Sequence, residues 1–282
     1  MLLVDFSPLV IASYMAIAFG SDNRSEVDLE LVRHVSLDGI RLINSKFRRR
    51  YGQPVFAIDS KGGSWRRDVF PYYKANRSKT RKESDIDWAE LLRCINTVAL
   101  ELKESFPYKV IEVPKSEADD IIGVLTKKAV ASGEEVMIIS GDKDFIQLQA
   151  GNQLVQQWDK RTESYIGADD PKRYLFEHVL KGDSGDGVPN ILSPGDCFVT
   201  KTRQKPMTQK RLDEFWEDKQ KLKEIPRFME NLKLIDLSFT PKDIQQNIIS
   251  MYDDYVVNDR NQLPNYFIAK RMKKLYESIN DF

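Results

Sequence analysis

The sequence is poor in the side chains that bind soft metals or act as nucleophiles. Its 282 residues include only two cysteines, Cys94 and Cys197, and two histidines, His34 and His178. Neither a C-x-x-C nor an H-x-x-x-H spacing occurs, which argues against zinc sites and disulfide frameworks. We expect Cys94 to fill the core, and either histidine to be an ordinary helix residue rather than a catalyst. Metal binding through carboxylate oxygens stays open.

Long hydrophobic runs are scarce too. The most apolar stretch is the start, MLLVDFSPLVIASYMAIAFG, but Asp5 and Pro8 interrupt it and no basic segment precedes it. It is also shorter than a membrane span needs, and it lacks the organisation of a signal peptide. We therefore expect a strand followed by a buried helix here, and a cytoplasmic protein.

Neither sign of charge is in excess. Lys+Arg and Asp+Glu both number 43, so the formal net charge is zero. The composition, 41% hydrophobic and 30% charged, is that of a globular protein, and the length suits one large domain or two unequal ones. Charge is segregated locally, and the segments where it gathers carry the functional information.

Strand-like and helix-like segments alternate through the first half of the chain. Short apolar runs such as MLLVDF, QPVFAIDS, YKVIEVP and EVMII are separated by stretches with helical apolar spacing. This alternation predicts a parallel central sheet with flanking helices, hence an α/β domain over residues 1–180. From about residue 169 the periodicity is helical, which predicts a helical region over residues 181–282.

Aspartates follow three of these predicted strands. The runs LLVDF, FAIDS and IISGDKD carry Asp5, Asp59, Asp142 and Asp144. In parallel sheets ligands bind beyond the carboxyl ends of the strands, so we expect these side chains to converge. A charge at the end of a buried run is costly unless it serves a purpose, and sets of oxygen ligands suit Mg²⁺ or Mn²⁺.

Two further acidic segments add candidates. In SEADD, Glu117 and Asp120 are three residues apart and share a helix face, whereas Asp119 should point elsewhere unless its first-turn position lets it lean in. In KGDSGDG, Asp183 and Asp186 flank a turn. Each segment alone is equally well explained as helix capping, a turn or a loose calcium loop. Only their joint occurrence favours a site.

A basic segment with interleaved aromatic residues follows Asp59. Residues 61–82 read KGGSWRRDVFPYYKANRSKTRK and contain a single acid. Cations bind phosphates and aromatic faces stack on bases, so the segment favours binding of single-stranded nucleic acid. The alternative is a solvated basic loop that Trp65 and Phe70 anchor to the core.

In their order, VDFS, AIDS, WRRD…YYKANR, SEADD, SGDKDFIQL and KGDSGDGVPN resemble the flap endonuclease, or 5′-nuclease, superfamily over nearly the whole chain. SEADD followed by SGDKDFxQL is highly specific as a pair. Within the superfamily the chain is most similar to the ribonuclease H (5′-3′ exonuclease) group of T-even-type bacteriophages. The resemblance implies a PIN-like nuclease domain with a basic arch or bridge at about residues 61–84, and a helical DNA-binding region after it.

The resemblance also implies a site with two Mg²⁺ ions, for which Mn²⁺ could substitute. We expect one ion at Asp5, Asp59, Asp120 and Asp142 and the second nearer Asp144, Asp183 and Asp186. The implied metal ligands are Asp5, Asp59, Glu117, Asp119, Asp120, Asp142, Asp144, Asp183 and Asp186. The implied catalytic cations are Arg66 and Lys74, and the nucleic-acid-binding residues are Tyr73, which would stack on a base, with Arg77, Lys79, Arg81 and Lys82.

One segment departs from the superfamily pattern. Cellular members carry a glycine-rich G-I-G-x-K hairpin after the last aspartate pair, and its second turn is not recognisable in GVPNILSPGDCFVTKTRQK. A monovalent cation in this hairpin is therefore in doubt. We expect Lys201, Arg203 and Lys205 to contact phosphates instead.

The implied activity is Mg²⁺-dependent hydrolysis of phosphodiesters at the 5′ end of RNA·DNA and DNA·DNA duplexes, including flaps. In phage this would remove RNA primers from the lagging strand in the host cytoplasm. A monomer is expected, with a single-stranded DNA-binding protein and a sliding clamp as candidate partners.

Three alternatives compete with this interpretation. A dehalogenase-type phosphatase needs D-x-D after the first strand, but here the residues are Asp5, Phe6 and Ser7. A PIN-type toxin ribonuclease is about half this length and lacks the basic arch. A non-catalytic nucleic-acid scaffold is compatible with the sequence, although converging acids would repel DNA unless metals neutralised them.

Overall fold

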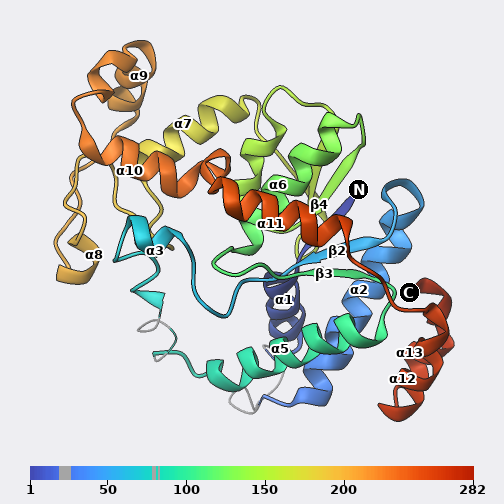
Figure 1. Cartoon of the computed structure of the whole chain (residues 1–282). Coiled ribbons are helices and arrows are strands. Elements are labelled where there is room, and N and C mark those ends of the chain that lie inside the picture. The colour runs from blue at the N-terminus through green and yellow to red at the C-terminus, as the bar shows by residue number, and fades with distance from the viewer. Residues whose placement is uncertain (19–26, 78–80, 82) are drawn as a thin grey trace.

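Figure 1 shows the computed structural model of the chain, which describes residues 1–18, 27–77, 81 and 83–282. Two predicted nucleic-acid-binding residues, Lys79 and Lys82, lie outside the described residues. At the centre is a sheet whose strands lie side by side in the order β3-β2-β1-β4-β5-β6. The strands are β1 (Leu2–Asp5), β2 (Pro54–Ala57), β3 (Lys109–Ile111), β4 (Val136–Ile139), β5 (Val155–Asp159) and β6 (Ser164–Ile166).

The sheet is parallel except at one edge. Strands β1 to β5 pair in parallel, and β6 pairs antiparallel with β5. This arrangement confirms the predicted fold class, although β6 was not predicted, because three exposed or half-exposed residues after a turn show no clear periodicity. After β1 the chain forms β2 and β3 on one side of β1, and then crosses to form β4 on the other side of β1. The strand order therefore puts a topological switch point between β1 and β4.

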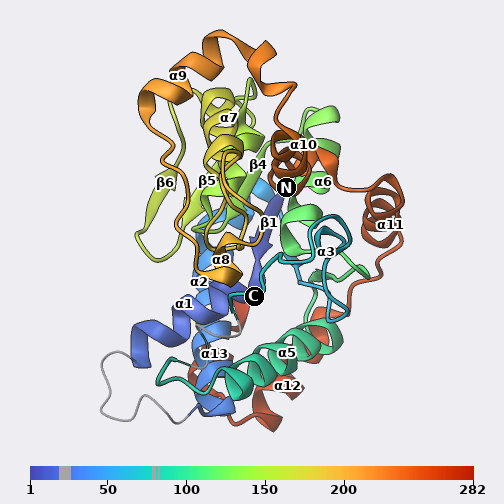
Figure 2. The same cartoon turned by 90° about the vertical axis from the view of Figure 1, so that its left-hand side faces the viewer.

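Helices cover both faces of this sheet, as the two views in Figures 1 and 2 show. Along β1, Leu2 and Val4 belong to an apolar cluster with α1, α2 and α5, whereas Leu3 belongs to a second cluster with α6 and α11. Side chains alternate along a strand, so a strand buried on both faces is a continuous apolar run. These helices are α1 (Phe6–Ala18), α2 (Leu29–Tyr51), α5 (Trp88–Ser105), α6 (Ala118–Ala131) and α11 (Lys242–Asp253).

Aspartates fix the starts of two of the long helices. Asp28 Oδ2 accepts a hydrogen bond from the Leu31 N–H at 2.8 Å before α2, and Asp87 Oδ1 accepts one from the Glu90 N–H at 3.0 Å before α5. Each carboxylate satisfies an amide that the helix cannot pair and complements the positive end of the helix dipole.

Beyond β6 the chain is helical, as predicted. Helix α10 packs beside α7, and α9 lies next to them at the top of Figure 2. The division of the chain near residue 180 stays a prediction. The elements are α7 (Pro171–Lys181), α8 (Cys197–Thr200), α9 (Gln209–Glu217), α10 (Pro226–Ile235), α11, α12 (Leu263–Ala269) and α13 (Lys273–Glu277).

The C-terminal segment returns to the sheet face covered by α2 and α5. Phe267 and Phe282 are fully buried, and their rings pack against Phe106 at the end of α5. This segment forms two short helices rather than one, because Arg271, at φ 57°, interrupts the helical backbone between α12 and α13. Among the described residues, no helix combines the length and apolarity needed to cross a membrane.

Candidate active site

Acidic side chains gather where the parallel strands end. Asp5 is the last residue of β1, Asp59 lies two residues beyond β2, and Asp142 follows β4 after Ser140 and Gly141. Because parallel strands end at the same edge, segments distant in the chain meet there, next to the switch point between β1 and β4.

Asp5, Asp59, Asp119 and Asp142, which we call the inner group, lie close enough for their charges to interact. Asp5 is 4% exposed, and its Oδ2 accepts a hydrogen bond from Ser140 Oγ at 3.0 Å. Burial, then the charges of Asp59 and Asp142, raise the pKa of Asp5 well above its usual value. Burial, then Asp142 and Asp5, likewise raise the pKa of Asp119. Mutual repulsion of this size requires carboxylates that lie close together.

Asp142 connects the inner group to the loop that follows. Its Oδ1 accepts a hydrogen bond from the Asp144 N–H at 2.9 Å, so it caps the 3₁₀ helix η1 (Lys143–Gln149). Burial, and after it the charge of Asp144, raises the pKa of Asp142 to about 6. Asp142 therefore caps a helix and also lies among the acids at the end of the sheet, and its role as a metal ligand stays a prediction.

A second group, here the outer group, consists of Asp144, His178 and Asp183. One ligand atom from each lies within 4.8 Å of those of the other two, and His178 Nε2 is 3.1 Å from Asp144 Oδ1. Burial lowers the pKa of His178, but Asp144 and Asp183 more than offset it, so the pKa is raised on balance. The expectation that His178 is only an ordinary helix residue therefore misses its contact with the acids. Its position in the last turn of α7, shortly before Asp183, was the signal that could have identified it.

The three acids of SEADD diverge at the start of α6. Glu117 is the N-cap, and its backbone N–H donates to Asp120 Oδ2 at 2.9 Å in a capping box. Asp119 is the member of the three that lines the pocket between the inner and outer groups. Its first-turn position lets it lean toward the sheet edge.

Asp120 does not join the inner group, and the prediction that it does is wrong. It is fully buried, and both its oxygens accept hydrogen bonds from protein donors. Arg66 Nη1 and Nη2 donate at 3.0 Å, Trp65 Nε1 at 3.2 Å and Thr240 Oγ1 at 2.8 Å. With its oxygens occupied in this way, Asp120 is a structural anchor for α6.

The predicted catalytic role of Arg66 is wrong for the same reason. Its side chain is 2% exposed. Besides the pair with Asp120, Nη1 lies 2.9 Å from Glu117 Oε2 and Nε donates to the Leu234 carbonyl at 2.8 Å. A guanidinium held by two carboxylates and a carbonyl in the interior does not reach a phosphate in the pocket.

Tyr73 is also buried, which contradicts its predicted stacking on a base. It is 3% exposed, and its ring belongs to an apolar cluster with Phe70 and Val188. Its hydroxyl lies 2.7 Å from Asp186 Oδ2 and 2.8 Å from Glu117 Oε2. Tyr73 therefore connects α6 to the loop after α7 and has no ring face for a substrate.

Lys74 and Arg77 are the cations of the basic segment that meet the acids. Lys74 Nζ pairs with Glu117 and lies 3.6 Å from Asp186 Oδ2, and Arg77 pairs with Asp186. Burial lowers the pKa of Lys74, but Asp186 and Glu117 raise it on balance, so the amine stays charged. The backbone N–H of Lys74 also donates to the backbone carbonyl of Asp186 at 2.7 Å. This hydrogen bond holds the basic segment against the loop after α7.

Members of the inner group, the outer group and the basic segment line one open pocket of about 460 Å³, which we call the acidic pocket. Arg81 does not line it, and its guanidinium lies 5.4 Å from the centre of the Trp88 ring. Lys201, Arg203 and Lys205 are exposed beyond α8 and do not line it either. The lining residues are Lys74, Arg77, Asp119, Gly141, Asp142, Lys143, Asp144, Tyr174, His178, Asp183, Gly185 and Asp186.

Comparison with known proteins decides the family. Residues 1–174 match the family described as 5′-3′ exonuclease, N-terminal resolvase-like domain, and residues 171–282 match that described as T4 RNase H, C terminal. The chain is 33% identical over 293 residues to the ribonuclease H of Enterobacteria phage T4, covering 99% of this chain and 95% of that protein. The chain belongs to the 5′-3′ exonuclease family. As a member of this family it is a 5′ nuclease.

Other relatives are longer than this chain or less similar to it in sequence. The thermostable DNA polymerase I of Thermus filiformis is 32% identical over 152 residues, which span 51% of this chain and 17% of the polymerase. A crystal structure of the flap endonuclease of bacteriophage T5, in complex with DNA and metal ions, superposes with a TM-score of 0.61. That superposition covers 90% of this chain and 99% of the T5 chain at 16% identity, so it shows a shared fold.

Proposed function

We propose that this protein is a Mg²⁺-dependent 5′-3′ exonuclease and flap endonuclease that acts at the 5′ end of RNA·DNA and DNA·DNA duplexes. The observation that carries the proposal is the acidic pocket, where carboxylates of the inner and outer groups meet beside Lys74 and Arg77. Similarity to a phage ribonuclease H over 99% of the chain supports the substrate class.

The donor set fits hard divalent cations. The inner group offers only carboxylate oxygens. Burial, and after it repulsion between carboxylates, raises the pKa values of Asp5, Asp119 and Asp142, and a bound cation would relieve that repulsion. We assign one ion to the inner group, with Asp119 in place of Asp120, and a second to Asp144, Asp183 and Asp186. Bound there, divalent ions would supply an acidified water as nucleophile and neutralise charge on the cleaved phosphate.

The protein's own cations would position the substrate. Lys74 and Arg77 line the acidic pocket together with Asp142, so a phosphate in the pocket would meet positive charge there. We propose that Lys74 has the catalytic role expected from the sequence, and that Arg77, rather than Arg66, is the second catalytic cation. No protein nucleophile is required, in keeping with a chain that contains two cysteines and two histidines.

The biological role follows from this activity. We propose that the enzyme removes RNA primers from the lagging strand during phage replication in the host cytoplasm, as a monomer. A single-stranded DNA-binding protein and a sliding clamp are the expected partners, because both occupy the same DNA.

Cleavage of 5′-labelled RNA·DNA, DNA·DNA and flap substrates, with Mg²⁺ or with a chelator, tests the proposal. We expect 5′-phosphorylated mononucleotides or short oligomers only when Mg²⁺ is present. Asp142→Asn should lower cleavage by roughly a thousandfold or more while duplex binding survives. The matched control is Asp243→Asn on the exposed surface of α11.

Each outcome of these assays has a distinct meaning. Normal cleavage by Asp142→Asn would show that Asp142 is not a metal ligand. Cleavage in the chelator would contradict the metal assignment. Binding without cleavage of any substrate would favour the non-catalytic scaffold instead.

A further inference from the structure

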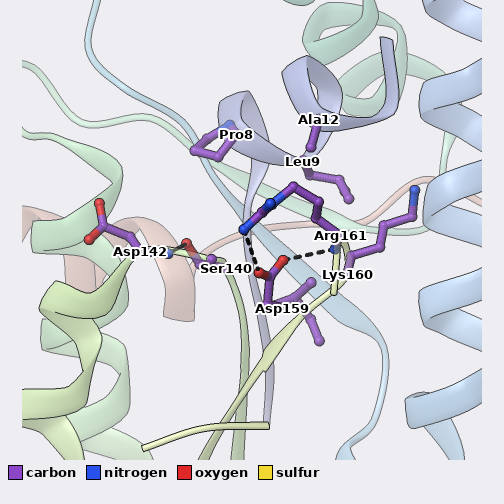
Figure 3. Close-up of a pocket in the computed structure, with 10 residues that line it drawn as sticks. Pro8, Leu9, Ala12, Ser140, Asp142, Asp159, Lys160 and Arg161 are labelled. Atoms are coloured by element: carbon purple, nitrogen blue, oxygen red, sulfur yellow. Dashed lines mark hydrogen bonds and ion pairs between the residues drawn. The ribbon is translucent and has the colours of Figure 1, made fainter. Parts of the chain in front are cut away.

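A second pocket, of about 310 Å³, opens beside the acidic pocket. Figure 3 shows it between the start of α1, which contributes Pro8, Leu9 and Ala12, and the turn that joins β5 to β6. Gly141 and Asp142 line both pockets, so the two share a wall. We call this second space the side pocket.

The walls of the side pocket are fixed by contacts around the β5–β6 turn. Asp159, 6% exposed, accepts a hydrogen bond from the Arg161 N–H at 2.8 Å through Oδ1. Lys160 turns away from the pocket, as Figure 3 shows, and its Nζ donates to Ser13 Oγ on α1 at 2.9 Å. A Cβ on Gly141 would lie 3.3 Å from the Asp159 carboxylate, so glycine lets the loop after β4 pass this close to β5.

Arg161 lies over the pocket, and its guanidinium makes few contacts with the protein. The Arg161 side chain is 74% exposed, and its Nη2 lies 3.6 Å from Asp159 Oδ2, which is longer than a hydrogen bond. In Figure 3 the Arg161 side chain extends across the pocket, and the end of its guanidinium turns toward Asp159. The pocket therefore combines an apolar wall with a planar cation, on a preformed frame, and its volume lies at the lower end of the range of ligand sites.

We propose that the side pocket binds the base of one of the two nucleotides that flank the cleaved phosphodiester. The proposal rests on the proposed function, which puts the scissile phosphate in the acidic pocket next to Asp142. A nucleotide there has its base within reach across the shared wall. One face of the base lies against Leu9 and Ala12, and the Arg161 guanidinium covers the other, an arrangement that accepts any base because every base has an apolar face.

The test compares an intact DNA·DNA substrate with substrates that carry one abasic residue at each side of the first cleaved bond. Single-turnover cleavage is measured in Mg²⁺ with the enzyme in excess over the substrate but below saturation. The wild-type enzyme should cleave one of the two abasic substrates roughly tenfold more slowly, because contacts with one buried apolar face are lost. An abasic residue three nucleotides away should have no effect.

Two substitutions connect this penalty to the side pocket. Ala12→Phe fills it and Arg161→Ala removes its cover, so in both variants intact and abasic substrates should be cleaved at nearly equal rates. The controls are Ala16→Phe, an exposed position on the same helix, and Arg93→Ala, an exposed arginine on α5. Both should keep the tenfold ratio. Because Arg161 is on the surface, its variant remains informative if Ala12→Phe does not fold.

The failures are separable. Equal cleavage of intact and abasic substrates by the wild-type enzyme, or a tenfold ratio that persists in both pocket variants, would overturn the base subsite and leave the nuclease function intact. Absence of cleavage on every substrate would overturn the proposed function and the subsite with it.

Discussion

Asp119 and Asp120 are adjacent in the chain, yet they have different surroundings. Asp119 lines the acidic pocket, where burial and then the other carboxylates raise its pKa, and Asp120 is buried against Arg66 and Thr240. Residue pattern alone predicted that strand-terminal acids converge, because parallel topology requires it. It could not predict which of two neighbouring acids in a first helical turn faces the pocket, since that depends on where the partner Arg66 is buried.

The buried pair of Asp120 and Arg66 gives a prediction about stability. Asp120→Asn leaves the buried Arg66 guanidinium with Glu117 as its one remaining carboxylate, so we expect the free energy of unfolding to fall by about 3 kcal/mol. Urea denaturation followed by circular dichroism measures the change. Asp243→Asn, exposed on α11, should stay within about 0.5 kcal/mol of the wild type. A loss below about 1 kcal/mol for Asp120→Asn would show that the pair is not a structural anchor.

The raised carboxylate pKa values predict an unusual dependence of stability on pH. Between the unfolded value of 3.8 and the folded value of about 6 for Asp142, the native state binds more protons than the unfolded state. Stability of the metal-free protein must then fall as pH rises through this interval. We expect a thermal midpoint a few degrees higher at pH 5.5 than at pH 7.5 in chelator.

Two controls accompany the thermal scan. Asp119→Asn removes one repelling charge and should shrink the difference between the two pH values. Mg²⁺ at pH 7.5 should restore the midpoint, because it neutralises the same repulsion. A midpoint that rises steadily with pH in the metal-free protein would mean that the acids of the inner group do not repel one another.

At the scale of elements, the junction between α7 and the loop that follows sets the position of Asp183. Gly182 has φ 69°, and a Cβ there would lie 2.4 Å from the carbonyl oxygens of Val188 and Pro189. Only glycine lets the helix end and the loop return so closely. The motif KGDSGDGVPN therefore needs its first glycine to bring Asp183 and Asp186 to the acidic pocket.

Gly182→Ala should cost more than about 3 kcal/mol of unfolding free energy, because it combines a backbone clash with an unfavourable positive φ. The control is Gly133→Ala after α6, where φ is 74° but no atom lies within 4 Å of the added Cβ. It should cost only about 1–2 kcal/mol. Chemical denaturation of both variants measures the difference, and equal costs would refute the close packing of the loop.

Elements were predicted well where burial was uniform and poorly where it was not. The strands β1, β2 and β4 are mostly apolar runs, and the start of α6 carries a capping box, so the sequence indicated these elements. The edge strand β6 and the interrupted pair α12 and α13 depend on a turn and on one residue with positive φ, Arg271. Local periodicity does not report either feature.

The basic segment shows the same limit. Sequence predicted its position next to the acids, and Lys74 and Arg77 confirm that proximity. It did not predict that Arg66 and Tyr73 turn inward, because aromatic and basic residues serve equally well as anchors of a loop and as contacts for nucleic acid.

For the molecule as a whole, a formal net charge of zero means that DNA is attracted by local groups of cations rather than by the total charge. Lys201, Arg203 and Lys205 are exposed on the segment after α8. Replacing all three by glutamine should weaken duplex binding. It should also reduce the slope of log affinity against log salt by up to about 0.9 for each lost phosphate contact.

Fluorescence anisotropy with a labelled duplex, at several salt concentrations, measures that slope. The control replaces Lys127, Lys273 and Lys274, which are also exposed and change the net charge equally. An unchanged slope in the first variant would remove this segment from the DNA-binding surface.

The most direct test of the account is the location of divalent ions in crystals of the protein soaked in Mn²⁺. The account predicts two anomalous peaks in the acidic pocket, one among Asp5, Asp119 and Asp142 and one among Asp144, Asp183 and Asp186. Asp120 should contact neither of them. Mn²⁺ bound only elsewhere, or a pocket that stays empty at millimolar Mn²⁺, would contradict it.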